Sequence, residues 1–279
     1  MRCPVCGGGV AVAADDNSLI CVDAHRFDIA RQGYVTLMDG RSSTHRSDTA
    51  DMVAARRRVH EVGLFDEIAS GVADVVASTR PQTGAPGVVF DAGAGTGHYL
   101  AAVLDADAHA HGIGMDLSKY CARAVARSHS RAASVVADIW RTLPIGTDEI
   151  DAVLSIFSPR NVDEFARVLR PGGLLVVVTP EPDHLGALIA PMRMLSVATG
   201  KDERLAAAVA TAFDIVDTRT IRADHALDAA TITDLVAMGP SAFHRPVDEI
   251  RSAAGTLTAH DARRIDVTVS VTVTTCRLR

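Results

Sequence analysis

The sequence predicts an α/β fold in which a doubly wound parallel sheet follows a small N-terminal metal-binding module. From residue 88 to residue 180, short apolar segments alternate with helical segments, which is typical of parallel sheets with crossover helices. Residues 1–40 differ, because they lack helical periodicity and hold three of the five cysteines. Hydrophobic residues make up 48 % of the 279 residues and aromatic residues only 4 %, so aliphatic side chains must form the core.

Composition also limits the class of protein. No apolar run approaches the ~20 residues that a membrane span needs, and the N-terminus lacks the pattern of a secretory signal. We therefore expect a cytoplasmic protein without membrane association. The formal net charge of −6 argues against a general nucleic-acid coat, although it permits a local basic surface such as "ARRR" at residues 55–58.

The chain is predicted to have three parts. Residues 1–40 form a module of short strands, residues 41–80 a helical linker region, and residues 81–279 the main domain. The linker begins with the turn-forming stretch "GRSSTHRSDT".

Two helices are expected in the linker region. Ser47 or Asp48 is expected to cap the first, which runs to Glu61 and ends at Gly63. The second is expected from Phe65 to Ala77, before the helix-breaking stretch "PQTGAPG".

The main domain is predicted to alternate strands and helices. Strands are expected at residues 88–93, 110–116, 133–139, 150–157 and 174–180. Helices are expected at residues 97–106, 118–129, 161–169 and 183–198, with a turn at "RPGG", residues 170–173. This order predicts a doubly wound sheet.

The C-terminal part has a different pattern. A strand is expected at residues 214–222, followed by a helix and loop at residues 227–245. Residues 264–276 ("RIDVTVSVTVTTC") alternate apolar and polar side chains, which predicts a strand with one buried face. We expect these two late strands to form an antiparallel pair at the edge of the sheet.

A glycine-rich loop, "DAGAGTGHYL" at residues 91–100, is the most informative short motif. It follows an apolar strand and opens a helix, so its free N–H groups and compact backbone suit a bound ligand. A dinucleotide fingerprint needs Gly or Ala at the sixth position from Gly93, where this chain has His98. The loop resembles the S-adenosylmethionine loop of class I (Rossmann-like) methyltransferases, and Asp91 would attract an ammonium group and repel a pyrophosphate.

Two further acids end the next strands. Asp116 in "GIGMD" can accept hydrogen bonds from both ribose hydroxyls, and Asp138 in "VVADI" is placed where this class binds the adenine amino group. Together with Asp91 and Gly93 they form a candidate cofactor site at the carboxyl ends of the strands. The alternative is that these aspartates only cap helices.

A metal site is predicted from the spacing Cys-x2-Cys-x14-Cys-x3-His, which comprises Cys3, Cys6, Cys21 and His25. Four such ligands suit tetrahedral Zn²⁺, and a closed four-ligand set indicates a structural site whose metal supplies folding free energy to a short segment. Two alternatives stay open. His45 or an aspartate could replace His25, or the cysteines could be buried without an ion.

Weaker signals surround the predicted site. In "SIFSPRN", Phe157 could stack on a base, whereas Asn161 could simply cap the following helix. His184 in "TPEPDHL" could contact cofactor or substrate, or be a surface residue. The "ARRR" run could meet phosphates, or form an ordinary solvated helix face.

Several segments, in order, carry a resemblance over essentially the whole chain. They are the Cys3His module, "HRFDIARQGYVTL", "DMVAARRRVHEVGLF", "DAGAGTGHYL" and "RPGGLLVVVTPEPDHL". With "MGPSAFH" and "VTVSVTVTTCR", they resemble the 23S ribosomal RNA guanine-N1 methyltransferases, in particular the actinobacterial branch linked to tylosin- and mycinamicin-type macrolide resistance.

The resemblance implies a site and a reaction. It implies structural zinc on the Cys3His set and cofactor contacts at Phe65, Gly95, Thr96 and His184. The implied reaction transfers a methyl group from S-adenosylmethionine to N1 of a guanine, of the guanine(748) type, in a 23S rRNA hairpin that lines the peptide exit tunnel. A homodimer that forms an RNA cleft is the expected assembly.

The reaction would benefit from a base that removes the guanine N1 proton, and Asp138, Asp183 and His184 are candidates. Two alternative functions remain. One is a methyltransferase with a small-molecule acceptor, which would have no use for a zinc module. The other is a non-enzymatic zinc-dependent RNA-binding protein, against which the intact acids and glycines argue.

Overall fold

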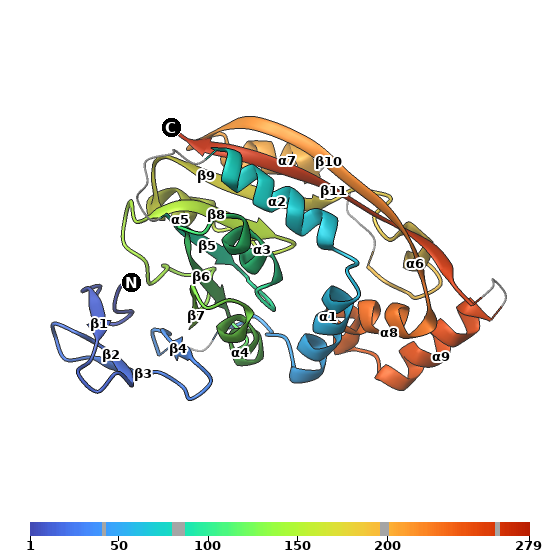
Figure 1. The fold of residues 1–279 in the computed structure, drawn as a ribbon, viewed down its shortest axis with the longest axis horizontal. Coiled ribbons are helices and arrows are strands. Elements are labelled where there is room, and N and C mark those ends of the chain that lie inside the picture. Colours follow the sequence, from blue (N-terminus) through green and yellow to red (C-terminus); the bar gives the residue numbers. More distant parts are fainter. Residues whose placement is uncertain (41–42, 80–86, 196–200, 260–262) are drawn as a thin grey trace.

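The computed structural model describes residues 1–40, 43–79, 87–195, 201–259 and 263–279. Over these residues the chain forms a small antiparallel sheet, β1-β2-β3, and an eight-stranded sheet of order β10-β11-β9-β8-β5-β6-β7-β4. The small sheet comprises β1 (Val10–Val12), β2 (Ser18–Cys21) and β3 (Arg26–Asp28). It lies at one end of the molecule, with the large sheet in the middle and helices α8 and α9 at the other end (Figure 1).

The parallel part of the large sheet confirms the predicted alternation. Its strands are β5 (Val88–Ala92), β6 (His111–Asp116), β7 (Ala132–Val136), β8 (Ile150–Ile156) and β9 (Leu169–Pro180). A short strand from the N-terminal segment, β4 (Tyr34–Thr36), pairs in parallel with β7. The three-residue run is too short to show periodicity, so its place in the main sheet was not foreseen.

The expected antiparallel pair is present as β10 (Phe213–Leu227) and β11 (Ile265–Leu278). The prediction of one buried face on β11 is wrong, because Ser270, Thr272 and Thr274 are also buried. The reason is that segments pack on both faces of β11: Val271 and Val273 belong to the apolar cluster of α2 (Asp66–Thr79) and α3 (His98–Ala106), and Cys276 to the cluster on the opposite face. The Thr272 hydroxyl, for example, donates to the Glu181 carboxylate.

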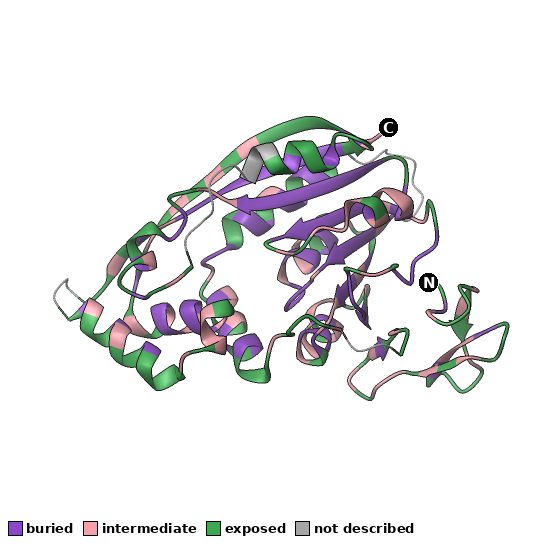
Figure 2. Ribbon diagram, turned by 180° about the vertical axis from the view of Figure 1, so that it is seen from behind, coloured by how far each residue is buried: buried purple, intermediate pink, exposed green. Residues whose placement is uncertain are grey.

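Helices cover both faces of the sheet, as the doubly wound prediction requires. One apolar cluster joins α2 and α3 to the sheet, and another joins α5 (Val162–Val168) and α7 (Lys201–Val209) to the opposite face. Helix α4 (Lys119–Ser128) contacts β6 and β7. The strands between these layers are buried along most of their length (Figure 2).

Helix α1 (Ala50–Glu61) begins one to two residues later than predicted. Its cap is Thr49, whose hydroxyl accepts a hydrogen bond from the Met52 N–H at 3.3 Å, rather than Ser47 or Asp48. Asp48 instead forms an ion pair with Arg56 at 2.6 Å. The end is as expected, because Gly63 has a φ of +77° and stops the helix.

The helix expected at residues 183–198 is wrong in length. The structure has only α6 (Gly186–Ile189) there, and residues 196–198 lie outside the described part of the chain. The helical conformation extends only to Ala190, and Arg193 has a φ of +50°, which is incompatible with a continuing helix. The "PQTGAPG" stretch lies almost wholly outside the described residues.

The expected turn at residues 170–173 is present inside β9. Leu169 pairs with Ile150 and Leu174 with Ala152, so the four residues between them loop out of the ladder, with Gly172 at a φ of +76°.

An excursion between β10 and β11 forms a helical lobe. It contains α8 (Ala229–Ala237), the 3-10 helix η1 (Pro240–Phe243) and α9 (Val247–Thr258), and α8 packs against α1 (Figure 1). No helix among the described residues is long and apolar enough to cross a membrane.

Candidate cofactor site and metal cluster

A cavity of about 530 Å³ lies at the carboxyl ends of β5, β6 and β8, under α1 and the helical lobe. All eight residues predicted to bind cofactor line it: Phe65, Asp91, Gly93, Gly95, Thr96, Asp116, Asp138 and His184. They come from five separate parts of the chain, and only the fold brings them together. Their roles toward a ligand stay predictions, but their common location is what a cofactor site requires.

The glycine loop has the backbone that its sequence indicated. Gly93, Gly95 and Gly97 all have positive φ values of +80°, +55° and +79°. A Cβ at position 93 would lie 2.7 Å from the Ser158 Cβ, and one at position 95 would lie 3.1 Å from a guanidinium nitrogen of Arg56. Both conformation and space therefore demand glycine, and the loop backbone lies open to the cavity.

Asp91 is a buried acid without a full set of partners. Its residue is 2 % exposed, and its Oδ2 has no hydrogen-bond partner among the described residues. Burial, with a further contribution from the charge of Asp116, raises the pKa of Asp91 to about 7. A buried carboxylate of this kind is stabilised by a cationic ligand, which fits the α-ammonium group of S-adenosylmethionine.

Asp116 and Asp138 hold the loops that carry them. The Asp116 carboxylate accepts from the Gly95 N–H at 3.0 Å and the Ser118 N–H at 2.8 Å, while burial raises its pKa. Asp138 accepts from the Trp140 N–H at 3.0 Å. The three acids are not helix caps: Gly97 precedes α3, Ser118 caps α4, and the element that follows Asp138 is the strand β8, so the capping alternative is wrong.

Arginines of the "ARRR" run act mainly within the molecule. Besides its pair with Asp48, Arg56 donates to the Met238 carbonyl at 3.0 Å and lines the cavity. Arg58 forms a bidentate pair with Asp234 of α8, at 2.7 and 2.6 Å. These two residues fasten α1 to the helical lobe, which neither the phosphate nor the solvated-face interpretation anticipated.

A histidine pair beside the loop was missed from the sequence. The Thr96 hydroxyl lies 2.9 Å from His60 Nδ1, and the rings of His60 and His98 stack at 4.1 Å. Burial, together with the charges of His98 and Arg56, lowers the pKa of His60 to about 3. Neutral His60 therefore orients Thr96 against the cavity, a contact that exists only because α1 folds over the loop.

Three rings form one wall of the cavity. Phe65 and His184 lie nearly parallel at 6.5 Å, and Phe157 lies 5.7 Å from His184. Phe157 is 42 % exposed and has a φ of +51°, a strained conformation of the kind that recurs at ligand sites. Asn161 makes no capping bond to α5; its amide instead donates to the carbonyls of Ile139 and Arg141 at 2.9 and 3.1 Å.

The geometry separates the three candidate bases. Asp183 does not line the cavity and pairs with Arg222 on the surface, which lowers its pKa. His184 Nδ1 accepts the Ser270 N–H at 3.2 Å, so the proton of the neutral ring is on Nε2, which can donate but not accept. Asp138 lines the cavity, where its carboxylate accepts from the Trp140 N–H and lies 3.6 Å from the Arg141 guanidinium.

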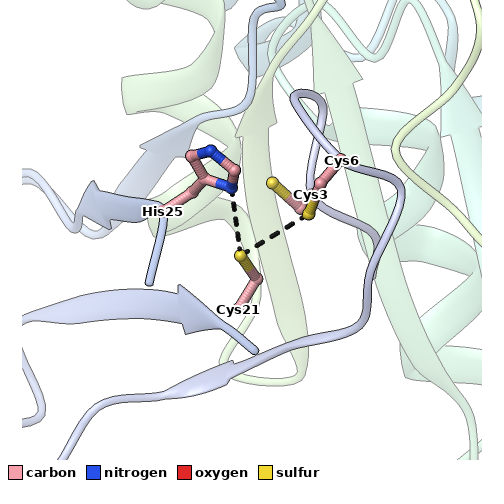
Figure 3. Close-up of side chains that lie close together, drawn as sticks. All are labelled: Cys3, Cys6, Cys21 and His25. Atoms are coloured by element: carbon pink, nitrogen blue, oxygen red, sulfur yellow. Dashed lines mark hydrogen bonds between the residues drawn. The ribbon is translucent and has the colours of Figure 1, made fainter. Parts of the chain in front are cut away.

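The four predicted metal ligands form a cluster in the N-terminal module. Their ligand atoms all lie within 4.8 Å of one another, and the side chains point toward a common centre (Figure 3). The Cys6 and Cys21 sulfurs are 3.7 Å apart, and Cys21 Sγ is 3.3 Å from His25 Nδ1. A tetrahedral site with Zn–S bonds of about 2.3 Å has ligand–ligand edges of about 3.8 Å, so the set fits zinc.

Two tight turns present these ligands. The Gly7 N–H donates to the Cys3 carbonyl at 2.9 Å, and the Ala24 N–H donates to the Cys21 carbonyl at 3.0 Å. Gly7 and Ala24 have φ values of +74° and +59°, which reverse the chain behind each ligand pair. His45 is not near the cluster but stacks on Trp140, so it does not replace His25.

Comparisons with known proteins agree with both parts of the site. Residues 1–41 match the zinc-ribbon family described as "RlmA, N-terminal", and residues 89–173 match a methyltransferase domain family. The chain is 41 % identical to the 23S rRNA (guanine(748)-N(1))-methyltransferase of Streptomyces fradiae, over 99 % of this chain and 96 % of the relative. The chain belongs to the 23S rRNA guanine-N1 methyltransferase family.

Other members of the family are similar over most of their length. A putative 23S rRNA (guanine-N(1)-)-methyltransferase of Micromonospora griseorubida is 42 % identical, over 88 % of this chain and 87 % of the relative. Among solved structures, a putative methyltransferase in complex with the Trm112 activator of Haloferax volcanii has a TM-score of 0.51 and 20 % identity, over 84 % of this chain and 99 % of that one. This likeness supports the class I methyltransferase fold.

Proposed function

We propose that this protein uses S-adenosylmethionine to methylate N1 of a guanine in 23S rRNA. The observation that carries the proposal is the buried Asp91 carboxylate, which lies unsatisfied in a cavity lined by every predicted cofactor residue. The near full-length likeness to the enzyme of Streptomyces fradiae supports the same acceptor.

The chain's residues suit each part of the cofactor. Asp91 and the open backbone of the glycine loop would hold the methionine ammonium and carboxylate groups, and Asp116 would accept the ribose hydroxyls. Asp138 would meet the adenine amino group. Phe65 and His184 form part of an aromatic wall against which the reacting groups can be positioned.

When bound, S-adenosylmethionine supplies an electrophilic methyl group on a sulfonium. The protein's task is to desolvate and orient the guanine, which can account for much of the acceleration. The target base has to leave its stack to enter the cavity, and Phe157 offers a half-exposed ring for it. The Nε2–H of His184 would donate a hydrogen bond to the reacting groups.

The N-terminal cluster would hold a structural Zn²⁺ through Cys3, Cys6, Cys21 and His25. All four positions are filled by protein ligands, so the ion would have no open position for catalysis. The folded module would recognise an RNA hairpin by shape and phosphates. We propose the hairpin that lines the peptide exit tunnel, with resistance to tylosin- and mycinamicin-type macrolides as the consequence of methylation.

Primer extension on 23S rRNA from a strain that lacks the gene tests the acceptor. Methylation at guanine N1 blocks base pairing, so the wild-type RNA should stop the polymerase at the tunnel hairpin and the deletion RNA should not. An unchanged stop would reject the RNA acceptor and favour a small-molecule methyltransferase. Isothermal titration with S-adenosylmethionine tests the enzyme class, since an absence of binding would favour a non-enzymatic RNA-binding protein.

A further inference from the structure

A groove joins the N-terminal module to the cofactor cavity. It has a volume of about 1000 Å³ and is lined on one side by Arg2, Cys3, Pro4 and Gly7, and on the other by the loop that follows β7. Asp138 and Trp140 line both this groove and the cofactor cavity. A chain that lies in the groove would therefore reach the reaction cavity past Trp140.

Trp140 is unusual for its exposure. It is the only tryptophan in a chain with 4 % aromatic residues, and it is 47 % exposed. An exposed ring of this size leaves a large apolar area in water unless a partner covers it.

The turn that carries Trp140 is held rigidly. The Trp140 N–H donates to the Asp138 carboxylate, and the Asn161 amide donates to the carbonyls of both neighbours of Trp140, Ile139 and Arg141. Arg141 is also paired with Asp39 at 2.6 Å, which ties the turn to the segment after β4. The backbone that carries the ring is thus held in place, which reduces the entropy lost when a partner stacks on the ring.

The ring already takes part in one stacking contact. His45 of the linker lies 5.6 Å from it with the planes 28° apart, and nearly half of the residue remains exposed. A flat ligand can therefore add to this stack or take the place of His45.

The charges of the groove favour stacking over phosphate contacts. Arg2 pairs with Glu149 at 3.2 Å, Arg141 with Asp39, and Arg167 with Glu164 at 2.6 Å. These arginines are neutralised within the protein, so an RNA strand here would be held chiefly through its bases.

We propose that the groove holds the RNA strand next to the target guanine, and that Trp140 is the platform on which the flanking base stacks. This inference rests on the proposed function, because it places the RNA of that reaction. When a base is extruded, its neighbour loses a stacking partner, and an aromatic ring beside the cavity entrance replaces that partner.

The single tryptophan allows a direct test. Tryptophan fluorescence, excited where tyrosine does not absorb, reports on Trp140 alone, and a stacked base quenches it. We expect quenching when the 23S rRNA hairpin is added, and loss of quenching when the flanking nucleotides, but not distant ones, are made abasic. Quenching that is unaffected by abasic flanks would overturn the inference.

Variants provide the second readout. Trp140→Ala should raise KM for the hairpin about 5- to 150-fold, the range for loss of one base–aromatic stack, and Trp140→Phe should recover most of it. The affinity for S-adenosylmethionine, measured without RNA, should stay within about twofold of wild type. Ile215→Ala, on the opposite edge of the sheet and 46 % exposed, is the matched control and should leave all values unchanged.

The outcomes separate this inference from the proposed function. If the wild-type protein neither binds nor methylates the hairpin, the proposed function fails. If the wild-type protein methylates it but Trp140→Ala keeps a normal KM, or loses cofactor affinity instead, only the role of Trp140 fails.

Discussion

Replacement of Asp91 by asparagine tests the reasoning about the cofactor cavity, because it removes a charge while keeping the shape. The folded pKa of Asp91 is about 7, whereas the ordinary value is 3.8. Asp91 therefore carries a proton below about pH 7 in the folded protein, but only below about pH 3.8 in the unfolded chain. The contribution of this group to stability is complete below about pH 4 and is lost as the pH rises through 7.

The magnitude follows from the two pKa values. A difference of roughly 3 pKa units at about 1.4 kcal/mol per unit makes the ionised, empty site cost up to about 4 kcal/mol above pH 7. Asp91→Asn should remove this cost, so the ligand-free variant should be more stable than wild type at pH 8. At roughly 2 °C per kcal/mol, the melting temperature should rise by ~8 °C at most, and much less at pH 5.

The same substitution should weaken cofactor binding. A bound ammonium group requires ionised Asp91, so wild-type affinity for S-adenosylmethionine should increase about tenfold from pH 6 to pH 8. Asp91→Asn should bind more weakly at pH 8 and lose this pH dependence. Titration calorimetry at the two pH values measures both effects.

A surface control accompanies the Asp91 experiment. Asp248→Asn, whose side chain is 84 % exposed, should change neither the melting temperature nor the affinity by more than the error. The reasoning is refuted if Asp91→Asn is no more stable than wild type at pH 8, or if it keeps the wild-type pH dependence of cofactor binding.

Three further predictions concern the loop, the metal cluster and the histidine pair. Gly93→Ala should weaken cofactor binding, measured by calorimetry, at least tenfold, because position 93 has a positive φ and the added Cβ would clash with Ser158. Adding Ser158→Gly should recover part of the loss, and no recovery would argue against the clash. Chelation of the metal, or Cys6→Ala, should reduce hairpin binding in gel-shift assays while sparing cofactor affinity; the reverse pattern would contradict the proposed division of roles. Folded His60 has a pKa of about 3, whereas the unfolded chain takes up this proton near pH 6.5, so the stability of the wild-type protein falls as the pH drops below 6.5. His60→Asn should lessen this loss of stability on acidification. Parallel acid denaturation curves for the two proteins would disprove this.

Short-range patterns predicted much of the site. The spacing of Cys3, Cys6, Cys21 and His25 was sufficient to predict that the four side chains lie together, because two tight turns and one hairpin bring the two ligand pairs close. The backbone conformation of the loop from Asp91 to Gly97 could also be predicted, since glycine adopts the positive φ values at its three positions without strain. The strand and helix alternation predicted the parallel sheet, and parallel strands place their terminal acids at one edge.

Contacts between distant segments could not be predicted in this way. Arg56 and His60 enter the cavity because α1 folds over the glycine loop, and their residue types resemble an ordinary helix surface. The buried polar face of β11 depends on the distant segments that cover both faces of the strand, whereas alternation alone indicates an exposed face. The exposure of Trp140 runs against its apolar character, so only the structure reveals it.

Local patterns are therefore enough to predict the metal-ligand turns, the glycine loop and the alternation of strands and helices, because backbone conformation depends on near neighbours along the chain. Packing between distant segments sets which side chains are buried together, which charges are neutralised and which ring remains in water. Burial and pKa cannot be predicted from neighbours alone, because they depend on segments that lie far apart in the sequence.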